Sequence, residues 1–486
     1  MIQKVKRVLA LLLCLVFAFS FAACGNKGDG GTGAEYYEDD MSKEVSLKWY
    51  IRIAEPKGAA EVVAEVNKYL KEKINATVDI VFVQPGDYDQ KMQMAMAANE
   101  KFDLVWTANW ANDYQNNILR GAFLELNDLL KATPDLQKFY SDDIWDAVSV
   151  NGTIYGVPNN QVLYDQSGLW FVKDVVEQYN LPIEDVKKME DLTPIYQAVK
   201  DNEPNMIPVR DGQPGIFQER MTGVGTTGIS IDKDGNVTDR LDETMPMYRI
   251  MRDWYEKGFF PSDVATMTDE TSLIKAKKIF SRYSRQLPGV SEKHRINYDY
   301  DVVNIATSEP ILSRSGVQST ITAVSATSEN PIRALKLVEL MQTDKYLANL
   351  MFYGIEGRDY EKDPENPNRI TRSSDSYYVS EFLVGNQFLG YILPAYYDTV
   401  WEETDEANKA APVDPFIGFS FDPTPVESEV TQMAAVSKEY GKIVSNGLQD
   451  PDVVVPEYME KLDTAGKQKV MDEIEKQFNE WKASQN

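Results

Sequence analysis

Cys24 is the residue whose surroundings point most clearly to chemistry. It follows the apolar run VLALLLCLVFAFSFAA, residues 8–23, which comes after Lys4, Lys6 and Arg7 and contains no acidic residue. A basic start, an apolar middle and small residues at the end form the pattern of a secretory signal. The run is shorter than the roughly 20 residues that a membrane-spanning helix needs. A cleaved signal is therefore favoured over a permanent span.

The end of this run, FAAC, resembles a bacterial lipobox, with Phe21 at the position where leucine is usual. The resemblance implies cleavage before Cys24, attachment of a diacylglycerol to its thiol and acylation of the new amino terminus. Two acyl chains anchor a protein stably, whereas one gives only marginal affinity. Cys14 lies inside the removable segment, so the mature chain would hold one lipidated thiol and no disulfide. The alternative is an ordinary signal peptide that leaves a secreted protein without lipid.

Side chains that enzymes use as nucleophiles or metal ligands are scarce. One histidine, His294, and the lack of cysteine after residue 24 leave little for zinc or for an imidazole-activated nucleophile. We expect His294 to be a solvated loop residue, and we expect neither a metal nor a cofactor. The 76 acidic residues leave open a pair of carboxylates of the kind that hydrolyses glycosides. No local pattern singles out such a pair.

The net charge limits the partners. The 50 basic and 76 acidic residues give a formal charge of −26, which becomes −29 when Lys4, Lys6 and Arg7 are removed with the signal. A chain this acidic meets phosphate groups with net repulsion. Nucleic acid and anionic lipid surfaces are therefore poor partners.

The body of the chain begins with alternating strands and helices. The periodicity predicts strands over 45–51, 77–84 and 103–107, with helices over 55–76 and 86–103 between them. Elements of these lengths in this order indicate parallel strands with crossover helices. Ligands of such sheets bind beyond the carboxyl ends of the strands. The loops that begin at Tyr50, Gln84 and Thr107 should therefore share the edge at which a ligand binds.

Turn and helix-start signals mark the later segments. Pro158 interrupts a short strand, and Asp234 with Gly235 indicates a hairpin. Asn330 and Pro331 begin one long amphipathic helix, which a glycine ends in YGIEG, residues 353–357.

Taken in order, these segments resemble the extracellular solute-binding proteins of ABC importers, specifically the lipoprotein group related to sugar-binding members. The order and spacing of several loose motifs carry the resemblance. They are the lipobox, KFDLVWTANWANDY, NGTIYGVP, ENPIRALKLVELMQTDKYLANLMFYGIEG and the closing segment that starts with GFSFDPTPVESEV. The closing segment is similar to a C-terminal domain of uncharacterised role found in this group.

The resemblance implies an α/β fold with two lobes, each a mainly parallel sheet flanked by helices, and a ligand cleft at the hinge. Crossings between the lobes are expected near 155–160, 304–310 and 353–357. Binding would favour the closed form, which a partner permease would read. The implied divisions are a signal peptide at 1–23, a flexible tether at 24–44, an N-terminal lobe at 45–160 plus 306–357, and a C-terminal lobe at 161–305 plus 358–486, which includes a family-specific region at 416–486.

Aromatic residues near the predicted loops favour a carbohydrate ligand. Sugars present apolar ring faces and a rim of hydroxyls, so their sites combine aromatic rings with amide and carboxylate partners. Trp110 is the strongest candidate because it follows a strand end and has Asn109 and Asn112 beside it. Arg52 would either grip an acidic group or be solvated at a helix start. The residues expected to bind the ligand are Tyr50, Arg52, Asn109, Trp110, Asn159, Gln161, Tyr164, Phe388, Trp401 and Phe419.

Three functions compete at this point. The first is a monomeric receptor, lipid-anchored on the extracellular face of a bacterial cell membrane, that delivers an oligosaccharide to the permease subunits of an ABC importer. The second is the same fold binding a peptide or another polar solute, or serving a sensor in place of a permease, because fold does not settle ligand class. The third is a glycoside hydrolase. The anchor, the aromatics and the scarcity of catalytic side chains favour the receptor over an enzyme.

Overall fold

The computed structural model describes residues 39–219, 221–226, 228–267 and 270–485. The expected signal peptide, Cys24 and most of the expected tether lie outside the described residues. Residues 41–486 form one compact unit, which the following paragraphs describe. Its buried side chains form three large hydrophobic cores and a small fourth one. None of the described helices has the length and apolar character needed to cross a bilayer.

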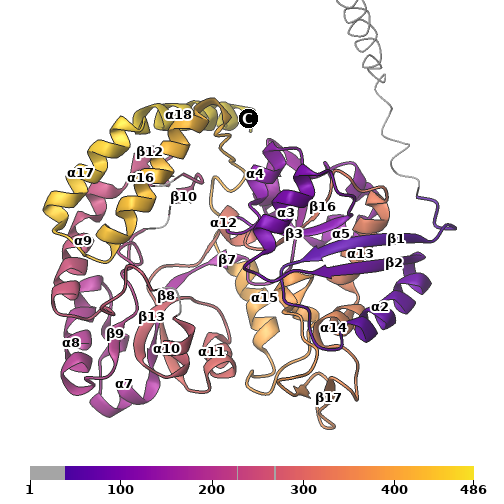
Figure 1. Ribbon diagram of the computed structural model, residues 1–486, viewed down its shortest axis with the longest axis horizontal. Coiled ribbons are helices and arrows are strands. Elements are labelled where there is room, and N and C mark those ends of the chain that lie inside the picture. Colours follow the sequence, from indigo (N-terminus) through magenta and orange to yellow (C-terminus); the bar gives the residue numbers. More distant parts are fainter. Residues whose placement is uncertain (1–38, 220, 227, 268–269, 486) are drawn as a thin grey trace, which may run out of the picture. The chain divides into compact units, whose positions relative to one another are not determined.

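The first lobe is built on a five-stranded sheet with the order β2-β1-β3-β16-β6 (Figure 1). β1 pairs in parallel with β2 and β3, whereas β16 runs antiparallel to both β3 and β6. The strands are β1 (Val45–Ile51), β2 (Ala76–Phe82), β3 (Leu104–Thr107), β6 (Gly156–Pro158) and β16 (Ile321–Val324). The helices of this lobe are α2 (Ala59–Ile74), α3 (Tyr88–Ala97), α4 (Tyr114–Leu119), α5 (Pro134–Phe139), α6 (Asp142–Val148), α13 (Pro331–Thr343) and α14 (Lys345–Tyr353). The predicted alternation of strands and helices over 45–107 is confirmed.

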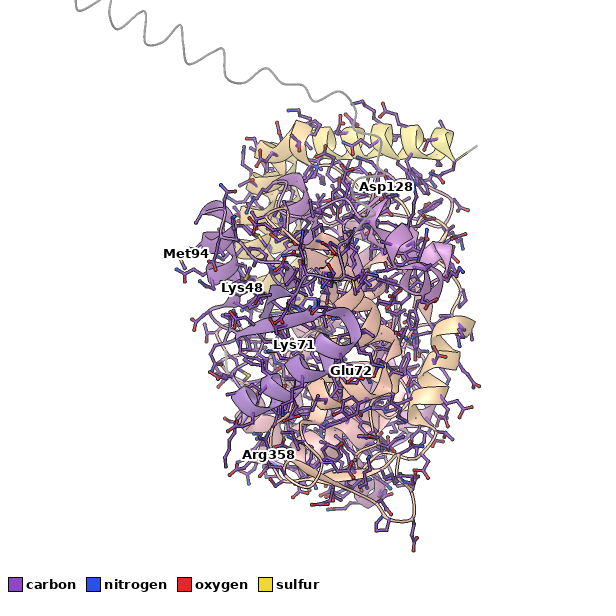
Figure 2. The ribbon with its side chains drawn as sticks, turned by 90° about the vertical axis from the view of Figure 1, so that its right-hand side faces the viewer. Lys48, Lys71, Glu72, Met94, Asp128 and Arg358 are labelled. Carbon is purple, nitrogen blue, oxygen red and sulfur yellow. The ribbon has the colours of Figure 1, made fainter. Side chains whose placement is uncertain are left out.

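Helix α2 illustrates how the sequence specifies these elements. Its buried residues include Val62, Val66 and Leu70, which recur every four positions and form one apolar face. Lys71 and Glu72 lie on the exposed side, as Figure 2 shows. Asn75 ends the helix in the left-handed conformation, with φ 47°. The periodic pattern and the stop residue thus fix both the packing and the length.

The single long helix expected after Asn330 is two helices. Pro331 begins α13 in its first turn as predicted, but Asp344 separates α13 from α14. The Asp344 carboxylate accepts a hydrogen bond from the backbone N–H of Leu347 at 3.0 Å. Aspartate favours such a cap over an interior helical position, which explains the break. Gly354, with φ 80°, ends α14 where the sequence predicted a stop.

The second lobe contains a four-stranded sheet with the order β14-β8-β13-β9. β13 runs parallel to β9 and antiparallel to β8, and β8 is also antiparallel to β14. The strands are β8 (Ser167–Val172), β9 (Ile207–Val209), β13 (Ile279–Arg285) and β14 (Val302–Ala306). Helices α7 (Lys173–Tyr179), α8 (Leu192–Asn202), α10 (Thr271–Lys275) and α11 (Val290–Tyr298) accompany them. The predicted α/β fold with two lobes and helix-flanked sheets is confirmed. The expectation of mainly parallel sheets is wrong, because both sheets are mixed and, among the described strands of the second lobe, only the β13–β9 pair is parallel.

His294 is a core residue, so the expectation of a solvated loop residue is wrong. It lies on α11 with 6% of its surface exposed. Its ring centroid lies 4.8 Å from those of Trp170 and Tyr298 and 4.7 Å from that of Tyr300. Tyr298 follows His294 by four residues, so both side chains share one helix face. Burial, with a smaller contribution from Arg282, lowers the pKa of His294 from 6.5 to about 4.

The free energy of unfolding should decrease as the pH falls, because of His294. Its folded pKa is below its unfolded value, so the unfolded chain binds more protons between pH 6.5 and pH 4. The stabilisation is complete above pH 6.5 and about 2 kcal/mol smaller at pH 5. Guanidinium unfolding at pH 7.5 and pH 5 should therefore show a smaller pH effect in His294→Phe than in the parent. Equal pH effects in the two proteins would contradict the burial of a neutral imidazole.

The C-terminal region has a core of its own. It contains the antiparallel sheet β10-β11-β12 and helices α9, α16, α17 and α18. The predicted hairpin at Asp234 and Gly235 is confirmed, because β11 pairs with β12 and Gly235 has φ 87°. Helix α9 places Tyr248 in this core and Trp254 in that of the second lobe, which joins the two cores. The elements are β10 (Thr222–Gly223), β11 (Ile229–Ile231), β12 (Val237–Asp239), α9 (Leu241–Glu256), α16 (Glu427–Ser445), α17 (Pro451–Thr464) and α18 (Lys467–Ser484).

The chain passes between the lobes along a short antiparallel ribbon. β7 (Tyr164–Asp165) pairs with β15 (Ile311–Leu312), and α12 (Arg314–Val317) follows directly. Figure 1 shows β7 and α12 between the two lobes. A third segment of the chain, residues 412–414, lies beside them. The N–H of Leu312 donates to the carbonyl of Pro412, and the N–H of Asp414 donates to the carbonyl of Leu312.

The chain does not leave the first lobe at 353–357, where the sequence predicted its third crossing between the lobes. The buried residues that follow Gly354, among them Tyr360, Tyr377 and Leu393, belong to the core of the first lobe. Small elements carry this part of the chain: β17 (Tyr360–Lys362), β18 (Ile370–Arg372) and α15 (Val400–Ala410). Buried residues between Tyr360 and Leu393 therefore pack with the first lobe, whereas the sequence had placed this segment in the second. Val400 and Trp401 of α15 belong to the small fourth core.

Candidate functional site

A pocket of about 380 Å³ lies where the two lobes meet, next to the β7–β15 ribbon. We call it the hinge pocket. The pocket is lined by four parts of the chain: first-lobe residues, the ribbon with α12, the β10 segment and residues 414–421. Its lining includes Asn109, Asp113, Gln115, Asp165, Thr222, Ser313, Arg314, Ser315, Gln318, Asp414, Phe419, Ser420 and Phe421.

The loop after β3 forms one lip of this region. The Oγ1 of Thr107 donates to the carbonyl of Asn112 at 2.5 Å, and Asn112 adopts the left-handed conformation with φ 45°. The Asp113 carboxylate then accepts the N–H of Asn116 at 2.8 Å and caps α4. This tight turn projects Trp110, whose surface is 55% exposed. Trp110 thus lies exposed just beyond the strand end at Thr107, and its contact with a ligand stays a prediction.

Trp110 is held in place although it is exposed. Its indole N–H donates to the carbonyl of Ser319 at 2.8 Å. Its ring meets that of Trp106 edge to face, with centroids 5.3 Å apart, and the Arg52 guanidinium lies 4.9 Å from its centroid. The Arg52 guanidinium thus lies over two indole rings, and its grip on an acidic group stays a prediction. An aromatic surface fixed in this way loses little conformational entropy when a ligand binds.

Two predicted amide side chains reach the same segment, 315–319. The Nδ2 of Asn109 donates to the carbonyl of Ser315 at 3.0 Å. The Nε2 of Gln161 donates to the Oγ of Ser319 at 3.0 Å. The structure thus brings together four predicted residues, Arg52, Asn109, Trp110 and Gln161, in what we call the Trp110 shelf. The shelf adjoins the hinge pocket because Asn109 and its hydrogen-bond partner Ser315 line that pocket.

The other predicted ligand residues are not part of the shelf. Asn159 is 1% exposed, and its amide donates to the Phe382 carbonyl and to Thr320 while accepting from Thr322, a role in packing. Tyr50 is buried and donates to Glu100 at 2.5 Å. The remaining predicted aromatics fill cores or pack beside them, because aromatic side chains near strand ends contribute large buried areas. They are Tyr164, Phe388, Trp401 and Phe419. Of these, Phe419 also lines the hinge pocket.

Three carboxylates in the hinge pocket were not foreseen. Asp165 accepts the hydroxyl of Ser313 at 2.6 Å, and Asp414 accepts that of Thr222 at 2.6 Å. Burial raises the pKa of the third, Asp113. The signal that could have found Asp165 is its place shortly after the predicted crossing at 155–160, four residues after Gln161. No such signal marked Asp414, because the third crossing between the lobes was predicted at 353–357.

The pocket is electronegative. Arg314 is buried there, and its guanidinium donates to the carbonyls of Ser149 at 2.7 Å and Asp146 at 3.4 Å. Burial lowers the pKa of Arg314 to about 10. An ion pair with Arg285 at 3.4 Å offsets the charge of Asp165, so Asp113 and Asp414 provide most of the negative charge that a ligand meets. Such a surface accepts hydrogen bonds from hydroxyls and repels anions. Within the part of the chain that the structure describes, no three His, Cys, Asp or Glu side chains are placed to hold a metal ion.

Comparison with sequence families gives two matches. The family described as bacterial extracellular solute-binding protein matches residues 53–348. A domain of unknown function (DUF3502) matches residues 415–483, which include α16, α17 and α18. The resemblance noted in the sequence is confirmed by these matches.

Similar proteins support the same grouping. A carbohydrate ABC transporter substrate-binding protein of Streptococcus pneumoniae serotype 4 is 28% identical over 493 residues, which cover 98% of each chain. The crystal structure of the N-glycan transport solute binding protein NgtS of Streptococcus pneumoniae has a TM-score of 0.82 and 25% identity over 91% of this chain and all of that one. The NgtS complex with Man5GlcNAc gives 0.74 and 26%, covering 91% of this chain and 99% of that one. The alginate-binding protein AlgQ2 shares the fold, with a TM-score of 0.64 and 16% identity over 91% of this chain and 99% of that one.

Proposed function

We infer the function from one premise: the chain belongs to the family of bacterial extracellular solute-binding proteins. Its members bind solutes and do not transform them, so the glycoside hydrolase interpretation falls away. We propose that the solute is a carbohydrate, captured between the two lobes at the Trp110 shelf and the hinge pocket. The protein would deliver it to the permease of an ABC importer.

The exposed, rigidly held indole of Trp110 is the observation that carries this proposal. Among the described tryptophans, Trp110 is the one with most of its surface exposed. The shelf adjoins the hinge pocket through Asn109, and the carboxylates of that pocket accept hydrogen bonds from hydroxyls. An aromatic face beside such acceptors matches the apolar face and hydroxyl rim of a sugar ring. The carbohydrate-binding proteins similar to this chain support the same ligand class.

The β7–β15 ribbon and the chain beside it are the proposed hinge. Residues that line the hinge pocket come from both lobes, so a ligand that touches both walls stabilises a closed arrangement of the lobes more than an open one. The permease would recognise this closed form. The protein would act as a monomer.

Cys24 is the proposed anchor. The lipobox-like FAAC would be cleaved before Cys24, and a diacylglycerol on its thiol would hold the protein on the outer face of the cell membrane. The glycine-rich segment after Cys24 would leave the lobes free to move above the membrane.

Calorimetric titration with a panel of oligosaccharides, amino acids and peptides tests the proposed function. We expect saturable one-to-one binding of an oligosaccharide and no release of new reducing ends. Tight binding of a peptide, with no response to any carbohydrate, would contradict the carbohydrate assignment. Sustained product release would contradict the receptor.

A further inference from the structure

We propose that the C-terminal region forms a second sugar subsite at Trp481, so that the receptor selects long, neutral oligosaccharides. This inference rests on the proposed function. It assigns a role to the C-terminal helix α18, which the matched domain of unknown function contains.

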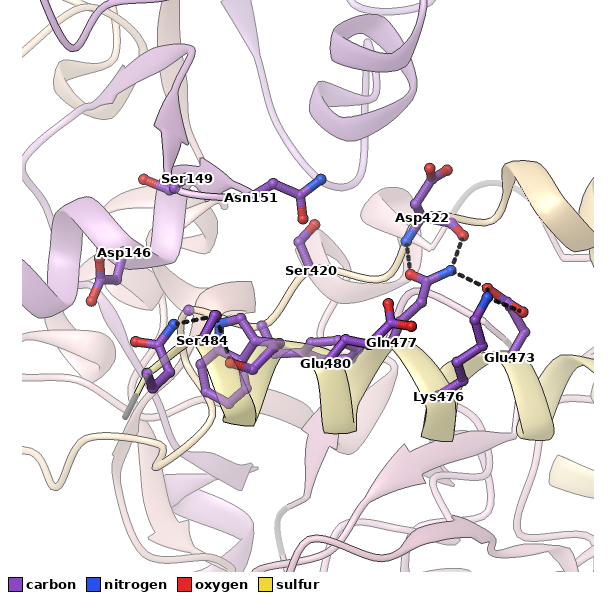
Figure 3. Close-up of a pocket in the computed structure, with 15 residues that line it drawn as sticks. Asp146, Ser149, Asn151, Ser420, Asp422, Glu473, Lys476, Gln477, Glu480 and Ser484 are labelled. Atoms are coloured by element: carbon purple, nitrogen blue, oxygen red, sulfur yellow. Dashed lines mark hydrogen bonds and ion pairs between the residues drawn. The ribbon is translucent and has the colours of Figure 1, made fainter.

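A pocket of about 530 Å³ lies between α18 and the first lobe (Figure 3). Helix α18 and the chain at 418–422 form one wall. The end of α6 and the turn between β4 (Ser149–Val150) and β5 (Thr153–Ile154) form the other. Figure 3 shows Asn151 across the open space from Glu480 and Ser484. We call this cavity the C-terminal pocket.

The lining of the C-terminal pocket has the composition that sugars require. The indole of Trp481 is half-buried and stacks on Phe478, with centroids 5.8 Å apart and planes at 20°. Polar side chains surround it, and the amide of Gln477 is fixed by two hydrogen bonds of 2.9 Å with the backbone of Asp422. An aromatic ring with amides, hydroxyls and carboxylates around it repeats the chemistry of the Trp110 shelf.

Ser420 links the two pockets. It lines both the hinge pocket and the C-terminal pocket. Its Oγ is buried and has no hydrogen-bond partner among the described residues. Buried hydroxyls in native proteins are nearly always paired, so an unpaired one calls for an explanation. A ligand hydroxyl that passes from one pocket to the other supplies the missing partner.

The charges of the C-terminal pocket select against anions. Asp146, Asp422, Glu473 and Glu480 line it together with one cation, Lys476, which contacts Glu473 at 3.0 Å. Four carboxylates and one ammonium group leave an excess of three negative charges when all are ionised. Together with the carboxylates of the hinge pocket, they repel uronates, sialic acids and sugar phosphates. The path from Trp110 to Trp481 therefore suits an uncharged glycan of several units.

Calorimetry of the full chain with Man1GlcNAc, Man5GlcNAc and an alginate oligosaccharide tests this inference. The variants are Trp481→Ala and Ser420→Ala, with Val453→Ala as a control that is exposed elsewhere in the C-terminal region. We expect Trp481→Ala to weaken Man5GlcNAc binding about tenfold and to change Man1GlcNAc binding less than twofold. Ser420 lies where the two pockets meet, so Ser420→Ala should weaken Man5GlcNAc binding more than Man1GlcNAc binding. Ser420→Ala should not lower the midpoint of guanidinium unfolding, because the hydroxyl it removes has no partner. If Trp481→Ala folds poorly, Ser420→Ala alone still tests the second subsite.

Each outcome is decisive. Unchanged Man5GlcNAc affinity in Ser420→Ala and Trp481→Ala, or equal losses for both glycans, would overturn the second subsite. Alginate binding as tight as that of Man5GlcNAc would overturn the selection of neutral ligands. If Man1GlcNAc still binds, the proposed function survives either result. Binding of no carbohydrate at all would overturn the proposed function and this inference together.

Discussion

Replacing Trp110 with alanine should weaken oligosaccharide binding about a hundredfold. The indole is 55% exposed and is held by Ser319 and Trp106, so it offers a preformed surface for a sugar ring. Aromatic anchors of this kind typically contribute at least about 2 kcal/mol, and a hundredfold loss corresponds to about 2.7 kcal/mol. Because the ring is largely exposed, the free energy of unfolding should change by less than about 1 kcal/mol. Calorimetric titration and guanidinium unfolding of the parent and the variant measure both quantities.

Tyr346→Ala is the matched control for this prediction. Tyr346 is also a large aromatic residue, 58% exposed, but it lies on α14, where it packs against Tyr69. Its removal should leave the affinity unchanged. Equal affinities in Trp110→Ala and in the parent would show that the shelf does not bind the sugar.

Replacing Cys24 with serine should release nearly all of the protein from the membrane fraction. Serine cannot carry the thioether-linked diacylglycerol, and the described part of the chain contains no helix that could span a bilayer in its place. Two acyl chains or more make retention stable, so their loss changes partitioning by orders of magnitude. Fractionation of expressing bacteria into membrane, cell and medium measures the distribution.

Cys14→Ser controls for a change inside the apolar run. This variant keeps Cys24 and should stay in the membrane fraction. If Cys24→Ser were retained as well as the parent, the lipid anchor would be contradicted, and an uncleaved apolar segment would be the better explanation.

Regular periodicity made the first lobe predictable. The apolar positions of α2, the buried strand at 104–107 and the break after α14 all follow from local patterns, and the structure has them where the sequence placed them. The segment after Gly354 lacks such a pattern. Its small elements pack through scattered residues such as Tyr360 and Tyr377, and these contacts come from tertiary structure alone. The sequence therefore placed the third crossing between the lobes too early in the chain.

The candidate site was predictable where a strand end marked it. Trp110 and Asn109 come just after β3, so their place at the edge of the sheet followed from topology. Other aromatic candidates such as Tyr50 fill the core. Composition does not distinguish an aromatic residue exposed at a site from one buried in the core. Asp414 and Ser420 reach the cleft through a part of the chain whose path the sequence did not reveal.

The distance between the lobes, measured with and without glycan, tests the central claim most directly. With Cys14 and Cys24 replaced by serine, the chain holds no other thiol, so Met94→Cys and Val453→Cys place two nitroxide labels on it. Both sites are exposed, Met94 on α3 of the first lobe (Figure 2) and Val453 on α17 of the C-terminal region. Saturation with an oligosaccharide that binds by calorimetry should shift the double electron–electron resonance distances to shorter values. Binding that leaves the distance distribution unchanged would contradict capture of the sugar by closure of the two lobes.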